Sequence, residues 1–321
     1  MKKVLINFRG GIGDYIMLAP MLENLFKTKQ YSLVLVADNN IKKLAEASHY
    51  FNQAFYFNYN ANILIKLWQL FILFWQLLFF KIDICITPIS TFGKTPALIS
   101  YLSKASTRIG FKQDKYSKVN NYQLNVFATE HDSKQNMKIL KTLNIVAKVT
   151  NPLITINNHN QQQVNLFLQQ HNIECTDKII AIAPFAIGVK GKNSKEWPWK
   201  KYKELIKKIV KKDNAQVIIL GTAKELAKVK NDEVITIDKV SLLDKNFSIL
   251  DTATLLQKAS LLICNDSGLM HIVAMFNIPI VSIWLSTNPK RYGYSAKKNV
   301  SELCGDVSVN KAWQVSLPYL K

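Results

Sequence analysis

The chain has 321 residues, enough for two domains of ordinary size or one large one, and 48% of them are hydrophobic. This composition excludes a disordered protein and predicts folded domains with sizeable cores. Lys and Arg number 42 against 22 Asp and Glu, a formal charge of +20 that is spread along the chain. The excess favours an anionic membrane surface or a phosphorylated substrate as partner, with a generally basic surface as the alternative. No zinc-finger spacing or RNA-binding motif indicates nucleic acid.

The first half of the sequence alternates short apolar runs with helical patterns. Strands are predicted at 3–7, 32–38, 54–57, 83–88 and 107–111. Helices are predicted at 15–27, 40–48, 63–80, 95–103 and 132–144. The N-terminal MKKVLINF is too short and too strand-like for a signal peptide, so we expect a cytoplasmic protein.

The segment ILIKLWQLFILFWQLLFF (63–80) approaches the length of a membrane span. Its three polar residues, Lys66, Gln69 and Gln76, fall within roughly 80° on a helical wheel. A strand-like run follows almost at once. We therefore favour a buried domain helix with surplus apolar surface, available to a bilayer or a partner, over a true span.

A polar stretch rich in Asn and Gln near 150–163 indicates a boundary between two domains, 1–155 and 156–321. Beyond it, strands are predicted at 178–186, 215–222, 234–237, 261–266 and 278–284. Helices are predicted at 198–212, 223–231, 253–260 and 267–277. The alternation predicts an α/β fold of two doubly wound, Rossmann-like domains facing a central cleft, with ligands at the carboxyl ends of the strands.

The four cysteines, Cys85, Cys175, Cys264 and Cys304, are far apart in the sequence, and two of them lie in apolar runs. This pattern predicts reduced, buried thiols in a cytosolic protein. It does not indicate a disulfide framework or a metal site.

The first stretch that carries chemistry is FRGGIGD (8–14), at the end of the first strand. It does not match G-x-G-x-x-G, which disfavours a dinucleotide site. Gly11 and Gly13 would let the backbone approach a ligand closely, and Asp14 would start the next helix. The alternative is that Asp14 is only a helix-capping residue.

Two further stretches lie at predicted helix N-termini, where backbone N–H groups and the helix dipole favour anions. In GKNSKEWPWKKY (191–202) the candidate anion-binding residues are Lys192 and Lys195. The alternative is a basic loop without a ligand. In NDSGLMH (265–271), Asp266, Ser267 and Gly268 would form a phosphate cradle. His271 would fall in the first turn, as a hydrogen-bonded packing residue or as a catalyst.

The order and spacing of these stretches resemble glycosyltransferase family 9, the lipopolysaccharide heptosyltransferases. The shared motifs are G-x-G-D-x-x-x-x-x-P (Gly11 to Pro20), K-x-W-P (Lys195 to Pro198) and NDSGLMHIVA followed by IP (Asn265 to Pro279). The resemblance covers roughly residues 1 to 290. It implies a GT-B fold with the acceptor on the first domain and the nucleotide-sugar donor on the second.

The resemblance also implies an inverting transfer of heptose from ADP-heptose, with no cofactor and no metal. Independently, no two aspartates are separated by one residue, so the D-x-D metal motif is absent. Asp14 would be the general base. Lys195, with Ser267 and Gly268, would stabilise the departing diphosphate. Asp266 would bind sugar hydroxyls, Lys192 would add to the donor site and His271 would support the phosphate loop.

One loop departs from the family. Where the family commonly has a GPT-D-P-like loop, the chain has LSTNP (285–289), which leaves the donor base and sugar open. The tail after about residue 295 shows no match and could pack back on the first domain.

We expect a lipid-linked acidic or phosphorylated saccharide as acceptor and a peripheral location on the inner face of the cytoplasmic membrane. The alternatives are a donor for another surface polysaccharide, or a non-catalytic nucleotide-binding protein of envelope assembly. An NAD-dependent oxidoreductase is disfavoured by the glycine pattern.

Overall fold

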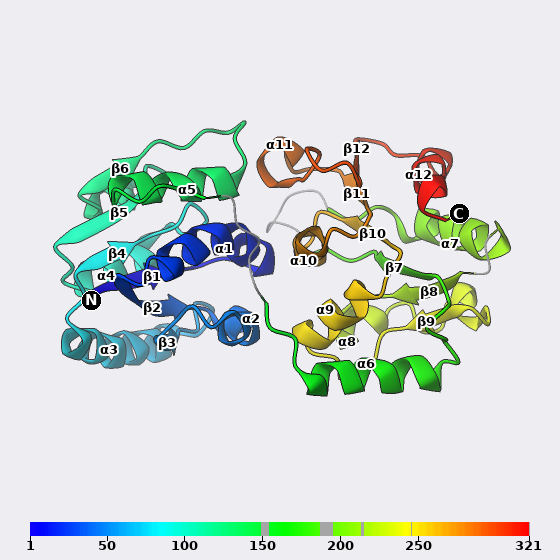
Figure 1. Ribbon diagram of the computed structural model, residues 1–321, viewed down its shortest axis with the longest axis horizontal. Coiled ribbons are helices and arrows are strands. Elements are labelled where there is room, and N and C mark those ends of the chain that lie inside the picture. Colours follow the sequence, from blue (N-terminus) through cyan, green and yellow to red (C-terminus); the bar gives the residue numbers. More distant parts are fainter. Residues whose placement is uncertain (149–153, 187–194, 213–214, 245, 321) are drawn as a thin grey trace. The chain divides into compact units, whose positions relative to one another are not determined.

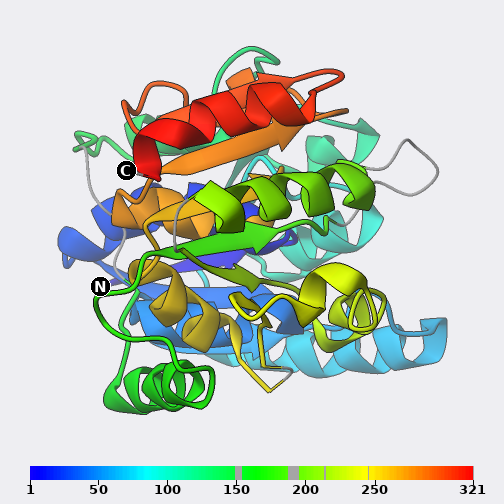
Figure 2. The ribbon, with the colours of Figure 1, turned by 90° about the vertical axis from the view of Figure 1, so that its right-hand side faces the viewer.

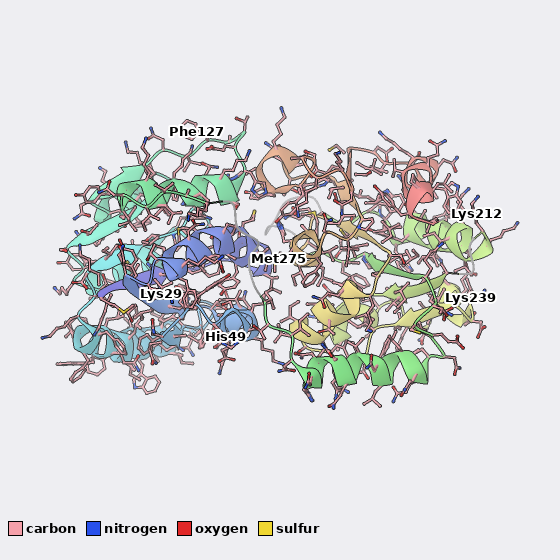
Figure 3. The ribbon with its side chains drawn as sticks, in the orientation of Figure 1. Lys29, His49, Phe127, Lys212, Lys239 and Met275 are labelled. Carbon is pink, nitrogen blue, oxygen red and sulfur yellow. The ribbon has the colours of Figure 1, made fainter. Side chains whose placement is uncertain are left out.

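The computed structural model describes residues 1–148, 154–186, 195–212, 215–244 and 246–320. By its internal contacts the chain divides into two compact units, Met1–Thr155 and Ile156–Lys321. Each unit is a parallel β-sheet with helices packed on it (Figure 1). Exposed lysines such as Lys29 and Lys212 project from both units (Figure 3), in line with a basic charge that is spread along the chain.

The first sheet has the strand order β3-β2-β1-β4-β5-β6. Its strands are β1 (Lys2–Asn7), β2 (Tyr31–Ala37), β3 (Gln53–Tyr56), β4 (Ile84–Ile86), β5 (Thr107–Phe111) and β6 (Tyr122–Leu124). Val4 in the fully buried part of β1 pairs with Leu33 on one side and Ile84 on the other. The order reverses between β1 and β4, which makes the carboxyl ends of these two strands the expected ligand-binding edge.

The helices of this unit are α1 (Ile12–Lys27), α2 (Lys42–Ser48), α3 (Ile63–Phe80), α4 (Lys94–Leu102) and α5 (Asp132–Thr142). α1 packs against α5, and α3 packs against α4. Leu73 and Leu77 of α3 join the apolar cluster that includes Leu5 of β1 and Val34 of β2. This cluster fixes α3 on the sheet.

The second sheet repeats the arrangement, with the order β12-β11-β10-β7-β8-β9. Its strands are β7 (Ile179–Ala183), β8 (Gln216–Ile219), β9 (Val240–Leu242), β10 (Leu261–Asn265), β11 (Ile280–Trp284) and β12 (Val300–Cys304). Its helices are α6 (Asn158–Gln170), α7 (Trp199–Lys212), α8 (Ala223–Leu226), α9 (Ile249–Gln257), α10 (Gly268–Phe276), α11 (Pro289–Tyr292) and α12 (Val309–Ser316). Here the order reverses between β7 and β10. The predicted α/β fold is confirmed.

Several elements of the second unit differ from the prediction. The apolar run 234–237, predicted as a strand, lies in a 3-10 helix (Glu233–Thr236), because the Asp232 side chain accepts a hydrogen bond from the Val234 N–H and starts a turn. The strand at this edge is β9 instead. α6 lies in the stretch interpreted as a polar boundary, and it buries Val164 and Phe167 on one face.

The C-terminal tail belongs to the second unit. α12 packs against α7 (Figure 2), Leu320 is buried in the second core, and Lys178 Nζ donates to the Leu320 carbonyl at 2.9 Å. Packing of the tail back on the first domain stays a prediction. Because the tail matches no motif, its packing on the second unit could not be predicted.

Two predictions about burial need correction. α3, predicted to be a buried domain helix with surplus apolar surface, has that surplus surface but buries only Leu73 and Leu77. It is the one helix in the described part of the chain that is long and apolar enough to cross a membrane. All four cysteines are free thiols, but only Cys85 and Cys264 are buried, whereas Cys175 and Cys304 are exposed.

Candidate active site

Asp14 lies in the first turn of α1, which begins at Ile12, three residues earlier than predicted. Gly11 is the N-cap residue, and its backbone N–H donates to Asp14 Oδ2 at 2.8 Å, which is one half of a capping box. The structure therefore gives Asp14 the capping role that was the alternative to catalysis. A carboxylate has about four acceptor positions, so the bond from the Gly11 N–H is compatible with a second role as a base.

The glycine of this loop that leaves no room for a side chain is Gly10, which the sequence analysis did not single out. A Cβ at position 10 would lie 2.7 Å from Asp14 Cβ and 2.8 Å from Phe8 Cζ, closer than carbon atoms pack. At Gly11 the nearest atom to such a Cβ is Asp14 Oδ2, at 3.7 Å. Gly13 lies inside α1. Gly10 thus keeps the loop tight against Asp14.

A cavity of about 330 Å³ with polar and aromatic lining residues adjoins this loop, where β1, β2 and β4 end. The Arg9 guanidinium lies 5.2 Å from the centre of the Tyr59 ring. The backbone N–H of Arg9 donates to Thr91 Oγ1 at 2.8 Å. Arg9 presents a planar fork of donors, which matches a carboxylate or a phosphate. The cavity is lined by Arg9, Gly10, Gly11, Asp38, Asn40, Tyr59, Asn60, Ser90 and Phe92.

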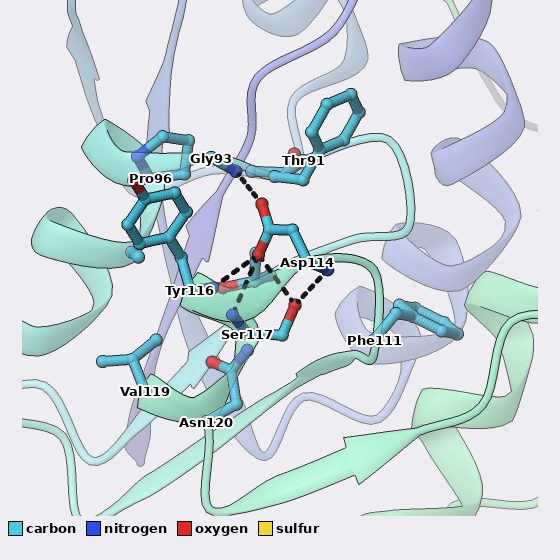
Figure 4. A pocket seen from close by; sticks show the side chains of 12 residues that line it. Thr91, Gly93, Pro96, Phe111, Asp114, Tyr116, Ser117, Val119 and Asn120 are labelled. Carbon is cyan, nitrogen blue, oxygen red and sulfur yellow. Dashed lines mark hydrogen bonds between the residues drawn. The ribbon is translucent and has the colours of Figure 1, made fainter.

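A second cavity in the same unit is structural. Its volume is about 10 Å³, which holds roughly one water molecule. Figure 4 shows Asp114 at its centre, accepting from the backbone N–H groups of Gly93, Tyr116 and Ser117 at 2.8–3.0 Å. These bonds start the 3-10 helix η2 (Lys115–Val119) and hold it to the loop before α4. There is no room for a sugar.

In the second unit, Asn265 joins the ends of the two central strands. It is the last residue of β10 and is fully buried. Its Nδ2 donates to the Pro184 carbonyl after β7 at 2.6 Å, and its Oδ1 accepts from the Trp197 N–H at 2.9 Å. The KEWP segment is therefore fixed against β10 just before α7 begins. A fully buried Asn at the end of an apolar strand was the signal for this role.

Lys195 and Asp266, predicted to act in one site, are in contact. Lys195 Nζ lies 2.7 Å from Asp266 Oδ2, with side chains that are 18% and 7% exposed. Thr287 Oγ1 donates to the same oxygen at 2.6 Å. Lys192 lies outside the described residues. The KEWP, NDSG and LSTNP segments thus meet at the carboxyl edge of the second sheet, and Thr287 is a contributor that the sequence analysis left without a role.

The N-terminus of α10 lies next to this pair. Ser267 is the N-cap residue in an extended conformation, and Gly268 begins the helix. Ser267 Oγ is buried and has no hydrogen-bond partner among the described residues. The first N–H groups of a helix lack intrahelical partners and carry positive partial charge. This edge is therefore suited to binding an anion.

His271 is buried within α10, and its Nδ1 lies 2.9 Å from the hydroxyl of Tyr294. The two rings meet edge to face at 5.5 Å. Burial raises the pKa of Tyr294 far above its usual value, so the phenol stays neutral. The geometry supports the packing alternative for His271, which ties α10 to the segment after β11. Tyr294 was not predicted, because it lies just beyond residue 290, where the family resemblance ends.

Within the described residues, no group of three His, Cys, Asp or Glu side chains is placed to hold a metal ion. Among the described residues, the charged groups at the second sheet edge include the Lys195–Asp266 pair, the end of α10, and Glu196, whose Oε1 accepts from the Ala186 N–H at 3.1 Å. Any charge that develops there on a ligand would be met by these groups.

Two doubly wound units, each with polar and charged residues at its strand-order reversal, have the architecture of the GT-B class. A family model described as glycosyltransferase family 9 (heptosyltransferase) matches residues 94–314. The match covers more than half of the chain, so the chain belongs to this family and is a glycosyltransferase. The predicted family and enzyme class are confirmed.

Solved structures share the fold at low sequence identity. The glycosyltransferase family 9 protein from Veillonella parvula matches with a TM-score of 0.84 and 18% identity, over 99% of this chain and 97% of that one. ADP-heptose lps heptosyltransferase II from E. coli matches with a TM-score of 0.78 and 16% identity, over 100% of this chain and 98% of that one. E. coli heptosyltransferase WaaC with ADP matches with a TM-score of 0.76 and 17% identity, over 99% of this chain and 100% of that one. No curated protein sequence matches this chain.

Proposed function

We propose that this enzyme transfers a heptose from ADP-heptose to a lipid-linked saccharide of the lipopolysaccharide core, with inversion and without a metal. The observation that carries the proposal is the contact of Lys195, Asp266 and Thr287 beside the N-terminus of α10. The names of the structural relatives, which include ADP and ADP-heptose, support this choice of donor.

In this proposal the second unit holds the donor. An ammonium has three donor hydrogens, and the bond to Asp266 uses one, so Lys195 can also meet a diphosphate oxygen. The N–H groups at Ser267 and Gly268 would share the charge that develops as the diphosphate departs. Asp266 would then hold Lys195 in place and accept from a sugar hydroxyl.

The first unit would hold the acceptor in the cavity beside Arg9, with Asp14 as the base. The acceptor oxygen attacks the anomeric carbon as the bond to the diphosphate breaks, and the leaving ADP takes the electron pair. The hydroxyl proton passes to the Asp14 carboxylate. Attack opposite to the leaving group inverts the anomeric centre. Arg9 would face an acidic group of the acceptor.

The alternative donor is supported by one specific difference. Leu285, Ser286 and Asn288 stand where the family commonly has Gly, Pro and an acid, and Asn288 serves as the N-cap of α11 through a bond from the Lys290 N–H at 3.0 Å. A donor with another base or sugar, for another surface polysaccharide, is therefore the second candidate.

The deciding experiment measures stabilisation of the purified protein by ADP-, GDP- and UDP-sugars, and then ADP release on adding acceptor. A specific donor at 100 times its Kd should add about 2.7 kcal/mol. Lys195→Met and Asp266→Asn should lose most of this gain. The matched control is Lys203→Met, because Lys203 pairs with Asp232 in the same unit, at 3.2 Å, outside the proposed site.

Each alternative has its own outcome. Stabilisation by a GDP- or UDP-sugar, and not by ADP-heptose, would contradict the proposed donor while leaving a transferase. Donor binding without release of ADP, with any saccharide acceptor tested, would contradict transfer and favour the non-catalytic binding protein.

A further inference from the structure

The polar and apolar sides of α3 are arranged in the opposite way from those of an ordinary surface helix, whose polar side faces solvent. Its polar residues Lys66, Gln69 and Gln76 are half-buried, on the same side of the helix as the buried Leu73 and Leu77. Gln69 Oε1 accepts a hydrogen bond from the Asn58 backbone N–H at 3.2 Å. The narrow polar stripe therefore faces the protein.

The opposite side of α3 is apolar and exposed. Trp68 is 65% exposed, Phe71 61%, Trp75 49% and Phe79 82%. The spacing of these residues places them in one stripe along the helix. A contiguous apolar surface of this kind marks a site of interaction with a membrane or a partner. We call it the α3 face, made of Leu64, Trp68, Phe71, Trp75, Leu78 and Phe79.

The surface beside the α3 face is basic. Between residues 63 and 119 the chain has eight Lys and Arg and two Asp. Both aspartates bind backbone N–H groups, Asp83 that of Lys3 at 2.7 Å and Asp114 that of Gly93 at 2.8 Å. α4 contacts both α3 and η2, so the segments that carry these charges adjoin one another. The exposed lysines are Lys81, Lys94, Lys104, Lys112, Lys115 and Lys118.

We propose that the α3 face docks in the plane of an anionic lipid bilayer. Trp side chains favour the headgroup level of a membrane, and clustered lysines favour anionic headgroups. An interfacial helix with apolar and basic flanks combines both contributions. The inference extends the proposed function, since a lipid-linked acceptor lies at such a surface, but its test does not depend on the donor.

The fold argues for docking rather than spanning. α3 runs from Ile63 to Phe80, about 27 Å at 1.5 Å per residue, which is short for a hydrocarbon core of about 30 Å. It connects β3 to β4 of one sheet, and Leu73 and Leu77 are part of the core on that sheet. Its inner side is therefore committed to the protein, and only the outer side can meet lipid.

The test is co-sedimentation of the full chain with vesicles of phosphatidylcholine, alone or with about one-third phosphatidylglycerol. The wild type should bind the anionic vesicles at low salt, more weakly as salt rises. Trp68→Ala/Trp75→Ala should weaken binding by about 10- to 100-fold at every salt concentration. Lys81→Glu/Lys94→Glu should weaken it mainly at low salt.

The matched control is Lys228→Glu/Lys230→Glu, the same change of charge on exposed positions of the second unit, which should bind like the wild type. Absence of wild-type binding, or undiminished binding by the tryptophan variant, would overturn the proposal. So would a wild-type dimer that the tryptophan variant converts to a monomer without any vesicle binding, because the α3 face would then join two copies of this chain.

Two further measurements separate this proposal from its neighbours. Alkaline carbonate should release the wild type from vesicles, whereas retention would indicate a spanning helix and contradict in-plane docking. With a water-soluble saccharide acceptor, the tryptophan variant should release ADP at the wild-type rate. A failure of vesicle binding with intact ADP release would reject docking and leave the proposed function standing.

Discussion

Lys195 Nζ and Asp266 Oδ2 lie 2.7 Å apart although 71 residues separate them in the chain. Both side chains are largely buried, and Thr287 adds a third contact. The pair joins the segment before α7 to the entry of α10. It therefore contributes to stability as well as to the proposed donor site.

Removing one member of this pair should destabilise the second unit. Lys195→Met leaves the Asp266 carboxylate without its cation, and we expect a loss of about 1.5–3 kcal/mol in the free energy of unfolding. Urea unfolding of Lys195→Met, Asp266→Asn and the double variant gives the coupling energy. A coupling below about 0.5 kcal/mol would mean that the two residues act independently.

Asp14→Asn should separate catalysis from capping. The amide oxygen can still accept from the Gly11 N–H, so the free energy of unfolding should stay near that of the wild type. An amide cannot act as a base, and turnover should fall by about 10²–10⁴-fold, with ADP affinity retained. Ser248→Ala, which removes the cap of α9, is the control: it should cost about 1 kcal/mol and leave turnover unchanged. Near-normal turnover in Asp14→Asn would reject the base assignment.

Gly10 and Gly11 should respond differently to the same substitution. Gly10→Ala drives a methyl group into Asp14 and Phe8, and we expect a loss of about 1–3 kcal/mol together with reduced turnover. Gly11→Ala meets only ordinary contact and should change stability by less than about 1 kcal/mol. Thermal unfolding and ADP release of both variants test this. Equal effects would show that the tight approach at Gly10 has no consequence.

Asp251 should make the second unit sensitive to acid. Burial raises the pKa of its carboxyl, but hydrogen bonds from Ser248 and Asn160 outweigh this and lower the pKa below its usual value. Because the pKa of the Asp251 carboxyl is lower in the folded state than in the unfolded state, the ionised carboxylate stabilises the folded protein. This stabilisation is fully present above the unfolded pKa, about 3.9, and is lost as the pH falls through the folded pKa. The stability difference between wild type and Asp251→Asn should therefore shrink below about pH 4. A difference that stays constant from pH 7 to pH 3 in urea unfolding would contradict the assignment.

The thiols should fall into two classes. Burial raises the pKa of Cys85 to about 11 and that of Cys264 still further, so both stay protonated and shielded. Cys175 and Cys304 are exposed and should react first with a chromogenic disulfide reagent. We expect two thiols to react quickly in the native protein and all four in denaturant. Rapid reaction of three or four native thiols would show that a core opens.

The central strands β1, β2, β7 and β10 could be predicted from the sequence, because each contains a run of three or more apolar residues that is buried. The edge strands β6 and β12 could not, since β6 has three residues and Tyr122 in it is 54% exposed. At such edges the pairing partner decides the structure and the local composition does not.

The site could be predicted only in part. Lys195 and Asp266 follow from motifs at the ends of predicted strands, but the Thr287 hydroxyl and the Tyr294 ring reach the site through tertiary packing that no local pattern shows. The orientation of α3 was hidden for a different reason. A helical wheel gives the width of a polar stripe but not the side that faces the core.

The strand order has a consequence for the protein during its synthesis. Val4 of β1 can pair with Ile84 only after β4 has been synthesised, and Ile180 of β7 can pair with Leu261 only after β10 has been synthesised. At about 5–20 residues per second, the ribosome takes about 4–16 s to cover each interval. During the first wait the nascent chain carries α3 before Cys85 and Ile99, its partners in the core, exist. Both sheet edges that we propose as binding sites are therefore completed late. The N-terminal half of either unit, made alone, would contain the glycine loop or the lysine segment but no finished site.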